Sequence, residues 1–175
     1  MISEAAERLK LRDGRVVEVR PLERCDRPLL KAAIGRLSDE SRYLRFGTSK
    51  PRMTERELDG LVDVDHHARE ALLAIDPLSG RGVAVVRYIQ LPGEPGVVEV
   101  AATVADDWQG AGLGTALLTG LMHRACDEGH SAVRATVLAA NNRSIAMLRR
   151  AGFRGVGGAG TLREHELALG VDKAG

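Results

Sequence analysis

Three glycines at alternate positions, Gly110, Gly112 and Gly114, stand where a strand-like run gives way to a helical one. The residues before them, "VVEVAATV", are typical of a strand, and the apolar residues after them recur with helical spacing. Glycine inside a helix costs about 0.5–1 kcal/mol relative to alanine, so three glycines near one helix start need a reason. The junction therefore predicts a strand, a turn and a helix whose first turn is almost bare of side chains.

Glycine at a helix start exposes backbone groups that side chains normally cover. The first four N–H groups of a helix have no partner inside it, and the helix dipole places about half a positive charge there. An anionic ligand can approach such a bare helix start, which is the basis of phosphate-binding turns. The alternative interpretation is that the glycines only let the helix pack closely against the sheet.

Two common phosphate-binding turns do not match the pattern. A nucleoside-triphosphate loop needs a lysine after its glycines, and this chain has Leu113, Gly114 and Thr115 there. A dinucleotide-binding turn needs the spacing G-x-G-x-x-G and an acidic residue at the end of the next strand. Here the spacing is G-x-G-x-G, and the next β-rich run ends in "VLAANN".

The pattern before this junction predicts an antiparallel meander. Runs rich in β-branched residues are separated by the turns "PLSGRG" and "PGEPG", which indicates neighbouring strands. Earlier in the chain, Ser38 and Thr54 can each cap a short helix, and a further helix is predicted within "DRPLLKAAIGRL". The strands predicted up to the junction are Val16–Leu22, Glu70–Asp76, Val83–Leu91 and Val97–Val104.

After the glycines, helices and strands alternate. The spacing predicts helices over about Gly112–Glu128 and Asn142–Ala151, a strand over Ala132–Leu138 and a final pair of strands, "FRGVG" and "TLREHELAL". A meander followed by strand–helix–strand units gives an α/β fold with a mixed, mostly antiparallel central sheet flanked by helices. We expect one domain over residues 1–175, with residues 1–14 as a loosely ordered N-terminal extension.

Composition excludes several classes of protein. The net charge is +1 and aromatic residues make up 3%, so neither a basic nor a base-stacking surface for nucleic acid is expected. No apolar run is long enough to cross a membrane, and Cys25 and Cys126 lack the paired spacing of a metal site. The adjacent His66 and His67 are expected in an exposed turn rather than on a metal. We expect a cytoplasmic protein without a metal and without a nucleic acid or membrane partner.

Two segments together resemble the GNAT superfamily of N-acetyltransferases. "VADDWQGAGLGTALL" is similar to the family's acyl-CoA-binding motif, Gln/Arg-x-x-Gly-x-Gly/Ala, which Gln109, Gly112 and Gly114 match. "NNRSIAMLRRAGF" resembles the later segment, an asparagine, a helix and then Gly-Phe. "SDESRYLRF" and "EVAATVADDWQGAGLG" also resemble the acetyltransferase domain of bacterial protein-lysine acetyltransferases. The resemblance, which extends from about Val16 to Leu169, implies the GNAT fold and acetyl-CoA as co-substrate.

The resemblance also implies a binding site. Pantetheine would run along the strand that ends at Val104, and Asn141 would lie near the pantetheine or the acetyl group. Three arginines, Arg143, Arg149 and Arg150, would reach the ribose phosphate or would instead form a solvated helix face. The residues implied to bind the diphosphate are Gln109, Gly110, Ala111, Gly112, Leu113, Gly114 and Thr115.

Glu99 is the candidate catalytic base. It interrupts an apolar strand that leads to the glycines, and an acidic residue in such a strand is expensive to bury without partners or a task. A carboxylate can take the proton of an attacking amine if burial raises the pKa of that carboxylate. The resemblance puts the family's catalytic glutamate at this position. The alternative is that Glu99 faces solvent while Val98 and Val100 face the core.

The general acid and the acceptor stay open. Many family members have a tyrosine in the late helix that can protonate the leaving thiolate, and this chain has Leu148 there. The implied acceptor is a primary amine, either a protein lysine or a small molecule, and a homodimer is left open. The alternative function is a regulatory domain that binds acyl-CoA without catalysis.

Overall fold

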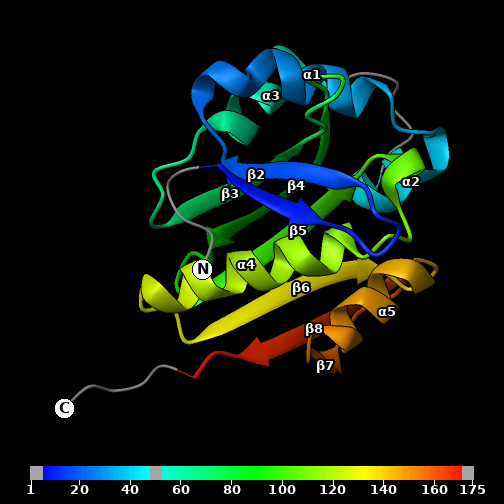
Figure 1. Ribbon diagram of the computed structural model, residues 1–175. Helices are drawn as coiled ribbons and strands as arrows, with labels where there is room; N and C mark the ends of the chain where they lie inside the picture. The colour runs from blue at the N-terminus through cyan, green and yellow to red at the C-terminus, as the bar shows by residue number, and fades with distance from the viewer. Residues whose placement is uncertain (1–5, 48–52, 171–175) are drawn as a thin grey trace.

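Eight strands form one sheet in the computed structural model, which describes residues 6–47 and 53–170 (Figure 1). The order across the sheet is β1-β2-β3-β4-β5-β6-β8-β7. The strands are β1 (Glu7–Lys10), β2 (Val16–Pro21), β3 (Arg69–Ile75), β4 (Gly82–Gln90), β5 (Val97–Val104), β6 (Ala132–Leu138), β7 (Arg154–Gly157) and β8 (Leu162–Ala168). The helices are α1 (Arg27–Gly35), α2 (Asp39–Phe46), α3 (Glu55–Val62), α4 (Leu113–Asp127) and α5 (Asn142–Arg150).

Strand direction changes at a single place in the described sheet. All neighbouring strands are antiparallel except β5 and β6, which are parallel. The chain crosses between these two strands through α4, as a parallel connection requires. The predicted mixed, mostly antiparallel sheet flanked by helices is therefore confirmed, and so is the meander of β3, β4 and β5.

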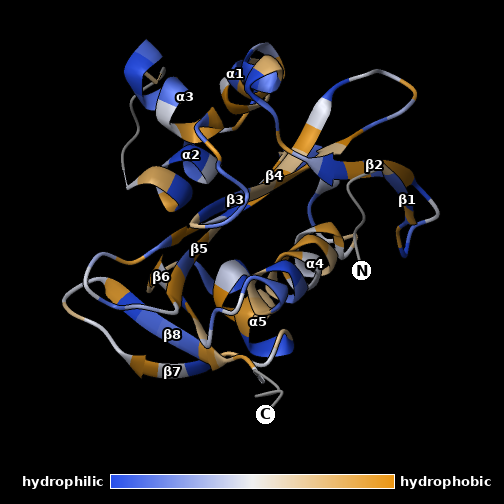
Figure 2. Ribbon diagram, turned by 90° about the vertical axis from the view of Figure 1, so that its left-hand side faces the viewer, coloured by the Kyte–Doolittle hydropathy of each residue, from blue (hydrophilic) through white to orange (hydrophobic). Residues whose placement is uncertain are grey.

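Helices cover both faces of the sheet. α1, α2 and α3 lie on one face and α4 and α5 on the other (Figure 1). Neighbouring residues of β3 bury their side chains on opposite faces: Leu72 belongs to the apolar cluster with Leu117 of α4, and Leu73 to the cluster with Leu30 of α1. Figure 2 shows hydrophilic and hydrophobic residues side by side on the helices, as expected for helices with one buried side.

Side-chain caps fix the starts of two short helices. The Ser38 hydroxyl accepts a hydrogen bond from Ser41 N–H at the start of α2. Thr54 and Glu57 form a reciprocal capping box at the start of α3. The two predicted caps are confirmed.

The N-terminal segment differs from its prediction. Residues 7–10 were expected within a loosely ordered extension, but they form β1, which pairs with β2. Leu9 packs against the core, and Leu11 is itself buried in it. A four-residue edge strand with one apolar side chain is too short to give a recognisable alternation, which is why the expectation failed for this segment. The remainder of the expected extension, residues 1–5, lies outside the described residues.

Candidate active site

An opening separates β5 from β6. The register of these parallel strands runs only from the pair Val97–Ala132 to the pair Glu99–Arg134. Beyond Glu99 and Arg134 both strands continue, paired on their outer edges with β4 and β8 respectively. The inner edge of β5 is therefore available to a ligand from residue 100 onward.

Backbone groups of β5 point into this opening. In an antiparallel pair, residues alternate between bonding to the partner strand and facing away from it. Ala105 N–H donates to Val83 O at 2.8 Å, which puts the odd-numbered residues of β5 in hydrogen bonds with β4. Beyond the last register pair, the residues of β5 whose N–H and C=O groups face the opening are Ala102 and Val104.

A cleft of about 710 Å³ follows the opening. α2 contributes one wall, and the first turns of α4 and α5 contribute the other. Pockets for small molecules and cofactors usually measure about 300–1,000 Å³, so the cleft is large enough for a substrate.

The start of α4 supplies a run of backbone donors at this cleft. Gly112 is the N-cap residue, and no side chain caps the helix. The first bond of the helix joins Ala116 N–H to Gly112 O at 3.0 Å. Within the described part of the chain, no group accepts a hydrogen bond from the N–H groups of residues 110–115. A diphosphate could be held by these backbone groups together with the helix dipole.

The three glycines of this turn have two different causes. Gly110 and Gly112 have φ values of 84° and 89°, in the left-handed region that disfavours other residues. Gly114 has ordinary helical geometry, but a Cβ added there would lie 2.9 Å from Met147 Sδ of α5. Close packing therefore explains Gly114, whereas backbone conformation explains the other two.

The side chain of Gln109 ties the turn to its surroundings. Its Nε2 donates to Val104 O at 3.0 Å and to Ser41 Oγ of α2 at 3.3 Å. Burial raises the pKa of the neighbouring Asp106, but hydrogen bonds from Ser41 and Ser38 outweigh it, and the pKa lies below its usual value. Because Gln109 occupies the Val104 carbonyl, the Val104 N–H is left for a ligand.

The other residues predicted to bind the diphosphate differ in what they expose. Ala111 and Leu113 are buried, so only their backbone can face a ligand. Thr115 lines the cleft. The predicted binding at this turn would therefore depend on main-chain groups far more than on side-chain identity.

Asn141 has a structural role at the start of α5. Its side-chain oxygen accepts a hydrogen bond of 3.0 Å from Ser144 N–H and so caps the helix. The residue is buried and lines the cleft, as its predicted role near the pantetheine or acetyl group requires. Arg143 and Arg150 also line the cleft, whereas Arg149 does not.

Glu99 lies at the last paired position before the opening. Its carboxylate accepts a hydrogen bond of 2.8 Å from Thr136 Oγ1 of β6. Val98 and Val100 face the core on the side of α4, so Glu99 lies on the opposite face, where it is half-buried. Val98 and Val100 thus face the core and Glu99 faces away from it, as the alternative interpretation expected. The carboxylate nevertheless lies beside the opening, and its role as a base stays a prediction.

The position of the family's tyrosine offers no proton donor. Leu148 is 2% exposed and packs in the core beside the cleft. Tyr43 is exposed, and the Tyr88 hydroxyl donates to His67 O at 3.0 Å. Burial raises the pKa of Tyr88 well above its usual value, so it is held in its protonated form.

His66 and His67 lie in an exposed turn, as predicted. His66 Nδ1 lies 3.0 Å from Glu70 Oε1, and His67 Nδ1 lies 2.6 Å from Glu128 Oε2. The described residues contain no group of three or more His, Cys, Asp or Glu side chains that could hold a metal ion.

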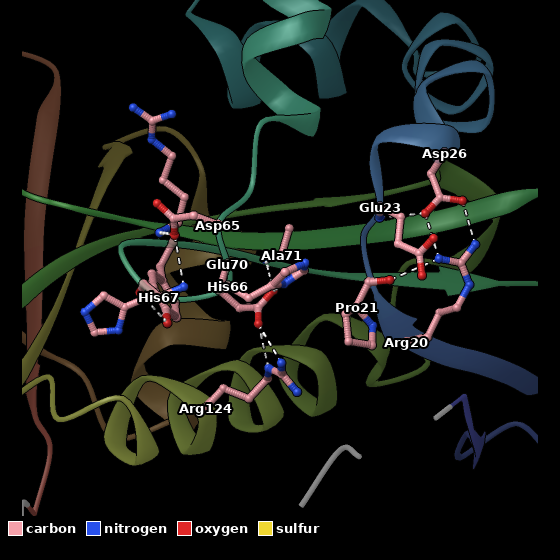
Figure 3. Close-up of polar contacts among 12 residues, drawn as sticks. Arg20, Pro21, Glu23, Asp26, Asp65, His66, His67, Glu70, Ala71 and Arg124 are labelled. Atoms are coloured by element: carbon pink, nitrogen blue, oxygen red, sulfur yellow. Dashed lines mark hydrogen bonds and ion pairs between the residues drawn. The ribbon is translucent and has the colours of Figure 1, made fainter. Parts of the chain in front are cut away.

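The sequence analysis missed a buried ion pair between β3 and α4. Glu70 is fully buried, and its Oε2 lies 2.7 Å from Arg124 of α4, while its Oε1 accepts from Ala71 N–H (Figure 3). The two charged residues are 54 positions apart, and no motif connects them. The only signal was an acidic residue at the start of an apolar strand, and that signal has several explanations.

The side chains that α2 contributes to the cleft were also missed. Ser41 and Arg45 of this helix line the cleft opposite the glycine turn. Their side chains reach the cleft because α2 packs against β5 and β6, an arrangement that helical periodicity does not reveal. None of the described helices combines the length and the apolar character needed to span a bilayer.

Comparison with known proteins agrees with this geometry. The chain matches the family model of the acetyltransferase (GNAT) domain over residues 17–154. Acetyltransferase PA5475 of Pseudomonas aeruginosa is 35% identical over 147 residues, which are 83% of this chain and 78% of the relative.

Solved structures give the same result. The GNAT domain of S. lividans PAT is 30% identical with a TM-score of 0.87, over 94% of this chain and 97% of that domain. The cAMP-binding acyltransferase from Mycobacterium smegmatis is 25% identical with a TM-score of 0.67, over 97% of this chain and 49% of the other. This chain therefore spans about half the length of the mycobacterial protein. Because the family model covers well over half of the residues, the chain belongs to the GNAT acetyltransferase family.

Proposed function

We propose that the chain transfers an acetyl group from acetyl-CoA to a primary amine. The observation that supports this proposal most directly is the run of N–H groups over residues 110–115, which have no partner among the described residues and lie next to the opening of the sheet. Neither feature is needed for the sheet to fold, and both suit a ligand with a diphosphate at one end and amide groups along its length.

The chain offers a partner for each part of acetyl-CoA. The N–H groups at the start of α4 would receive the diphosphate, and the inner edge of β5 would pair with the pantetheine amides through Ala102 and Val104. Arg143 and Arg150, which line the cleft, would meet the ribose phosphate. The thioester would then lie near Glu99, where β5 and β6 separate.

The reaction needs a neutral amine. An amine of the lysine type has a pKa near 10.4, so at pH 7 about one molecule in 10³ is nucleophilic, and deprotonation costs roughly 4–5 kcal/mol. Glu99, directly or through a water molecule, would accept the proton as the amine nitrogen bonds to the thioester carbon. The carbon–sulfur bond then breaks, and the thiolate of coenzyme A leaves and is protonated by solvent, since Leu148 offers no proton.

The first choice of acceptor is a protein lysine, and a small-molecule amine is the second. The likeness to the GNAT domain of S. lividans PAT and the segments around Ser38 and Glu99 support this order. A regulatory domain that binds acyl-CoA without catalysis is the competing function, and the leucine at position 148 is the observation in its favour.

Two measurements separate these functions. Calorimetric titration of the protein with acetyl-CoA tests binding, and release of free thiol in the presence of amines tests transfer. A cell extract incubated with labelled acetyl-CoA then tells whether proteins or small amines become labelled. Binding without thiol release on a broad panel of amines would support the regulatory function instead, and failure to bind at millimolar coenzyme would refute both.

A further inference from the structure

Arg45 lies in a position that is unusual for an arginine. It belongs to the last turn of α2 and lines the cleft, and its Nε donates to Thr103 Oγ1 of β5 at 3.1 Å. Within residues 6–47 and 53–170, no group accepts a hydrogen bond from its two terminal nitrogens, and no carboxylate lies within ion-pair distance. The side chain is half-buried, so its charge is partly removed from water without a counter-ion.

Arg87 adds a second positive charge behind Arg45. Both line a chamber of about 10 Å³ beside the cleft, roughly the space of one water molecule. Arg87 is 6% exposed, its terminal nitrogens donate to the carbonyls of Leu61 and Gly60 at the end of α3, and its Nε has no partner among the described residues. These bonds hold Arg87 in place, so it cannot turn away from Arg45.

The charge of Arg45 is destabilised as a result. Burial, and after it repulsion from Arg87, lower the pKa of Arg45 to about 10, while attraction to Glu99 opposes the decrease. A guanidinium ordinarily stays above 12. An anion bound at Arg45 would relieve this destabilisation, because a buried charge is tolerated when it is paired.

Glu99 and Arg45 provide opposite charges on the same side of β5, and Arg45 lines the cleft. Glu99 and Thr103, the partner of Arg45, face the same side of β5. Four residues of strand separate their Cα atoms by about 13 Å. A substrate whose amine lies at Glu99 could therefore place a carboxylate toward Arg45.

We propose that Arg45 binds a carboxylate group carried by one of the two substrates, close to the reacting centre. The guanidinium presents its donors in a planar fork that matches a carboxylate. The inference rests on the proposed function, since it names the chemical class of substrate for the same site. The carboxylate belongs either to a dicarboxylic acyl group on coenzyme A or to an amino-acid acceptor. Within the proposed function, the inference therefore favours the small-molecule amine over the protein lysine, or a longer acyl group over acetyl.

The test compares charged and neutral substrates in two arms. The first arm measures kcat/KM for succinyl-CoA and acetyl-CoA with one neutral amine. The second measures kcat/KM for L-lysine and L-lysine amide with acetyl-CoA. We expect the substrate with the extra carboxylate to be preferred at least about tenfold in one arm, the effect of a charge-assisted pair of hydrogen bonds. The arm that shows the preference identifies the source of the carboxylate.

Variants assign the preference to the guanidinium. Arg45→Met should abolish it while leaving the affinity for coenzyme A unchanged, and Arg45→Lys should keep part of it. Arg36→Met is the matched control, because Arg36 donates to Gly82 O and does not line the cleft. A purely structural Arg45, stacked on Phe46 at 4.8 Å, would lower the melting temperature when replaced without changing the substrate ratio.

Calorimetry measures the dissociation constants of the same two substrate pairs, and their ratios are compared in the same way. Wild-type protein without a preference in either arm, or a preference that survives in Arg45→Met, would overturn the proposal. The substrate preference of the wild-type protein can refute the proposal without any variant, so the proposal remains testable if Arg45→Met fails to fold. Absence of thiol release from every substrate would refute the proposed transfer instead, and the binding ratios would still test the carboxylate site.

Discussion

The Thr136 hydroxyl donates a hydrogen bond of 2.8 Å to the carboxylate of Glu99, across the point where β5 and β6 separate. One residue comes from each strand, so the bond closes the narrow end of the opening. It also fixes one carboxylate oxygen beside the opening. If Glu99 accepts the proton of the amine, its replacement should affect chemistry more than binding.

Glu99→Gln keeps the shape of the side chain and removes its basicity. We expect kcat to fall more than tenfold while the dissociation constant for acetyl-CoA is unchanged. Steady-state thiol release and calorimetric titration measure the two quantities. Glu94→Gln is the control, since Glu94 is paired with Arg134 at 2.8 Å outside the cleft. Unchanged turnover in Glu99→Gln would remove Glu99 from the mechanism.

Thr136→Val removes the hydrogen bond but leaves the carboxylate. The expected result is a several-fold decrease in kcat, smaller than that of Glu99→Gln, because Glu99 is still present but less well positioned. The double variant should be no worse than Glu99→Gln alone, since Thr136 acts only through Glu99. Additive losses in the double variant would show that Thr136 contributes by another route.

Gly110→Ala and Gly129→Ala form a matched pair at the two ends of α4. Both glycines are exposed, have φ values of 84° and 81°, and would place a Cβ in open space. Each substitution should lower the free energy of unfolding by about 1–2 kcal/mol, because a left-handed backbone disfavours alanine. Only Gly110→Ala should also weaken coenzyme A binding, at least tenfold, since it disturbs the row of N–H donors. Equal affinity in the two variants would argue against the diphosphate site.

Arg124→Met tests the buried pair with Glu70. The carboxylate is fully buried, and loss of Arg124 leaves it with the hydrogen bond from Ala71 N–H and the contact with His66 Nδ1. Because a permanent counter-charge is removed from a buried pair, the substitution should cost about 3–5 kcal/mol in the free energy of unfolding. Replacing both residues by methionine should recover much of this loss. Urea unfolding measures the free energy for both variants. Arg8→Met is the control and should change little, because the Arg8 side chain, which pairs with Glu18, is 75% exposed. A small loss in Arg124→Met would show that Arg124 is not the main counter-charge of Glu70.

Glu55 gives a prediction about acid stability. Hydrogen bonds from Lys31 and Arg27 lower the pKa of Glu55 from 4.5 to about 2. Since the folded state has the lower pKa, this contribution to stability is complete above pH 4.5 and is lost as the pH falls toward 2. The urea midpoints of the wild type and Glu55→Gln should differ by a constant amount at neutral pH and converge between pH 4.5 and 2. A difference that persists at pH 2 would contradict the pairing.

Much of the fold could be predicted from local pattern. The predicted helix Asn142–Ala151 exceeds α5 by only one residue. The prediction is this close because an N-cap and a strong amphipathic period mark the helix in the sequence. The strand Val97–Val104 was predicted to the residue, since turns bound it on both sides. β1 was not predicted, because its four residues contain too little periodic signal.

The candidate site was predictable only in part. The glycine turn has a signature in three alternate glycines, but the letters do not separate Gly114, which packs against Met147, from Gly110, which needs its left-handed backbone. The position of Arg45 in the wall of the cleft depends on how deeply α2 packs against β5, and no single segment of the sequence specifies that packing. Local sequence therefore specified the turn, whereas tertiary packing determined the opposite wall of the cleft.

The short parallel register between β5 and β6 has a consequence for the working cycle. A sheet that stops pairing at Glu99 leaves the N–H groups of Ala102 and Val104 to water when no ligand is present. Under the proposed function, each turnover would exchange that hydration for the amides of the donor and then restore it when the spent carrier departs. Solvent reordering along one strand edge would thus be a built-in step of entry and release, separate from the chemistry at Glu99.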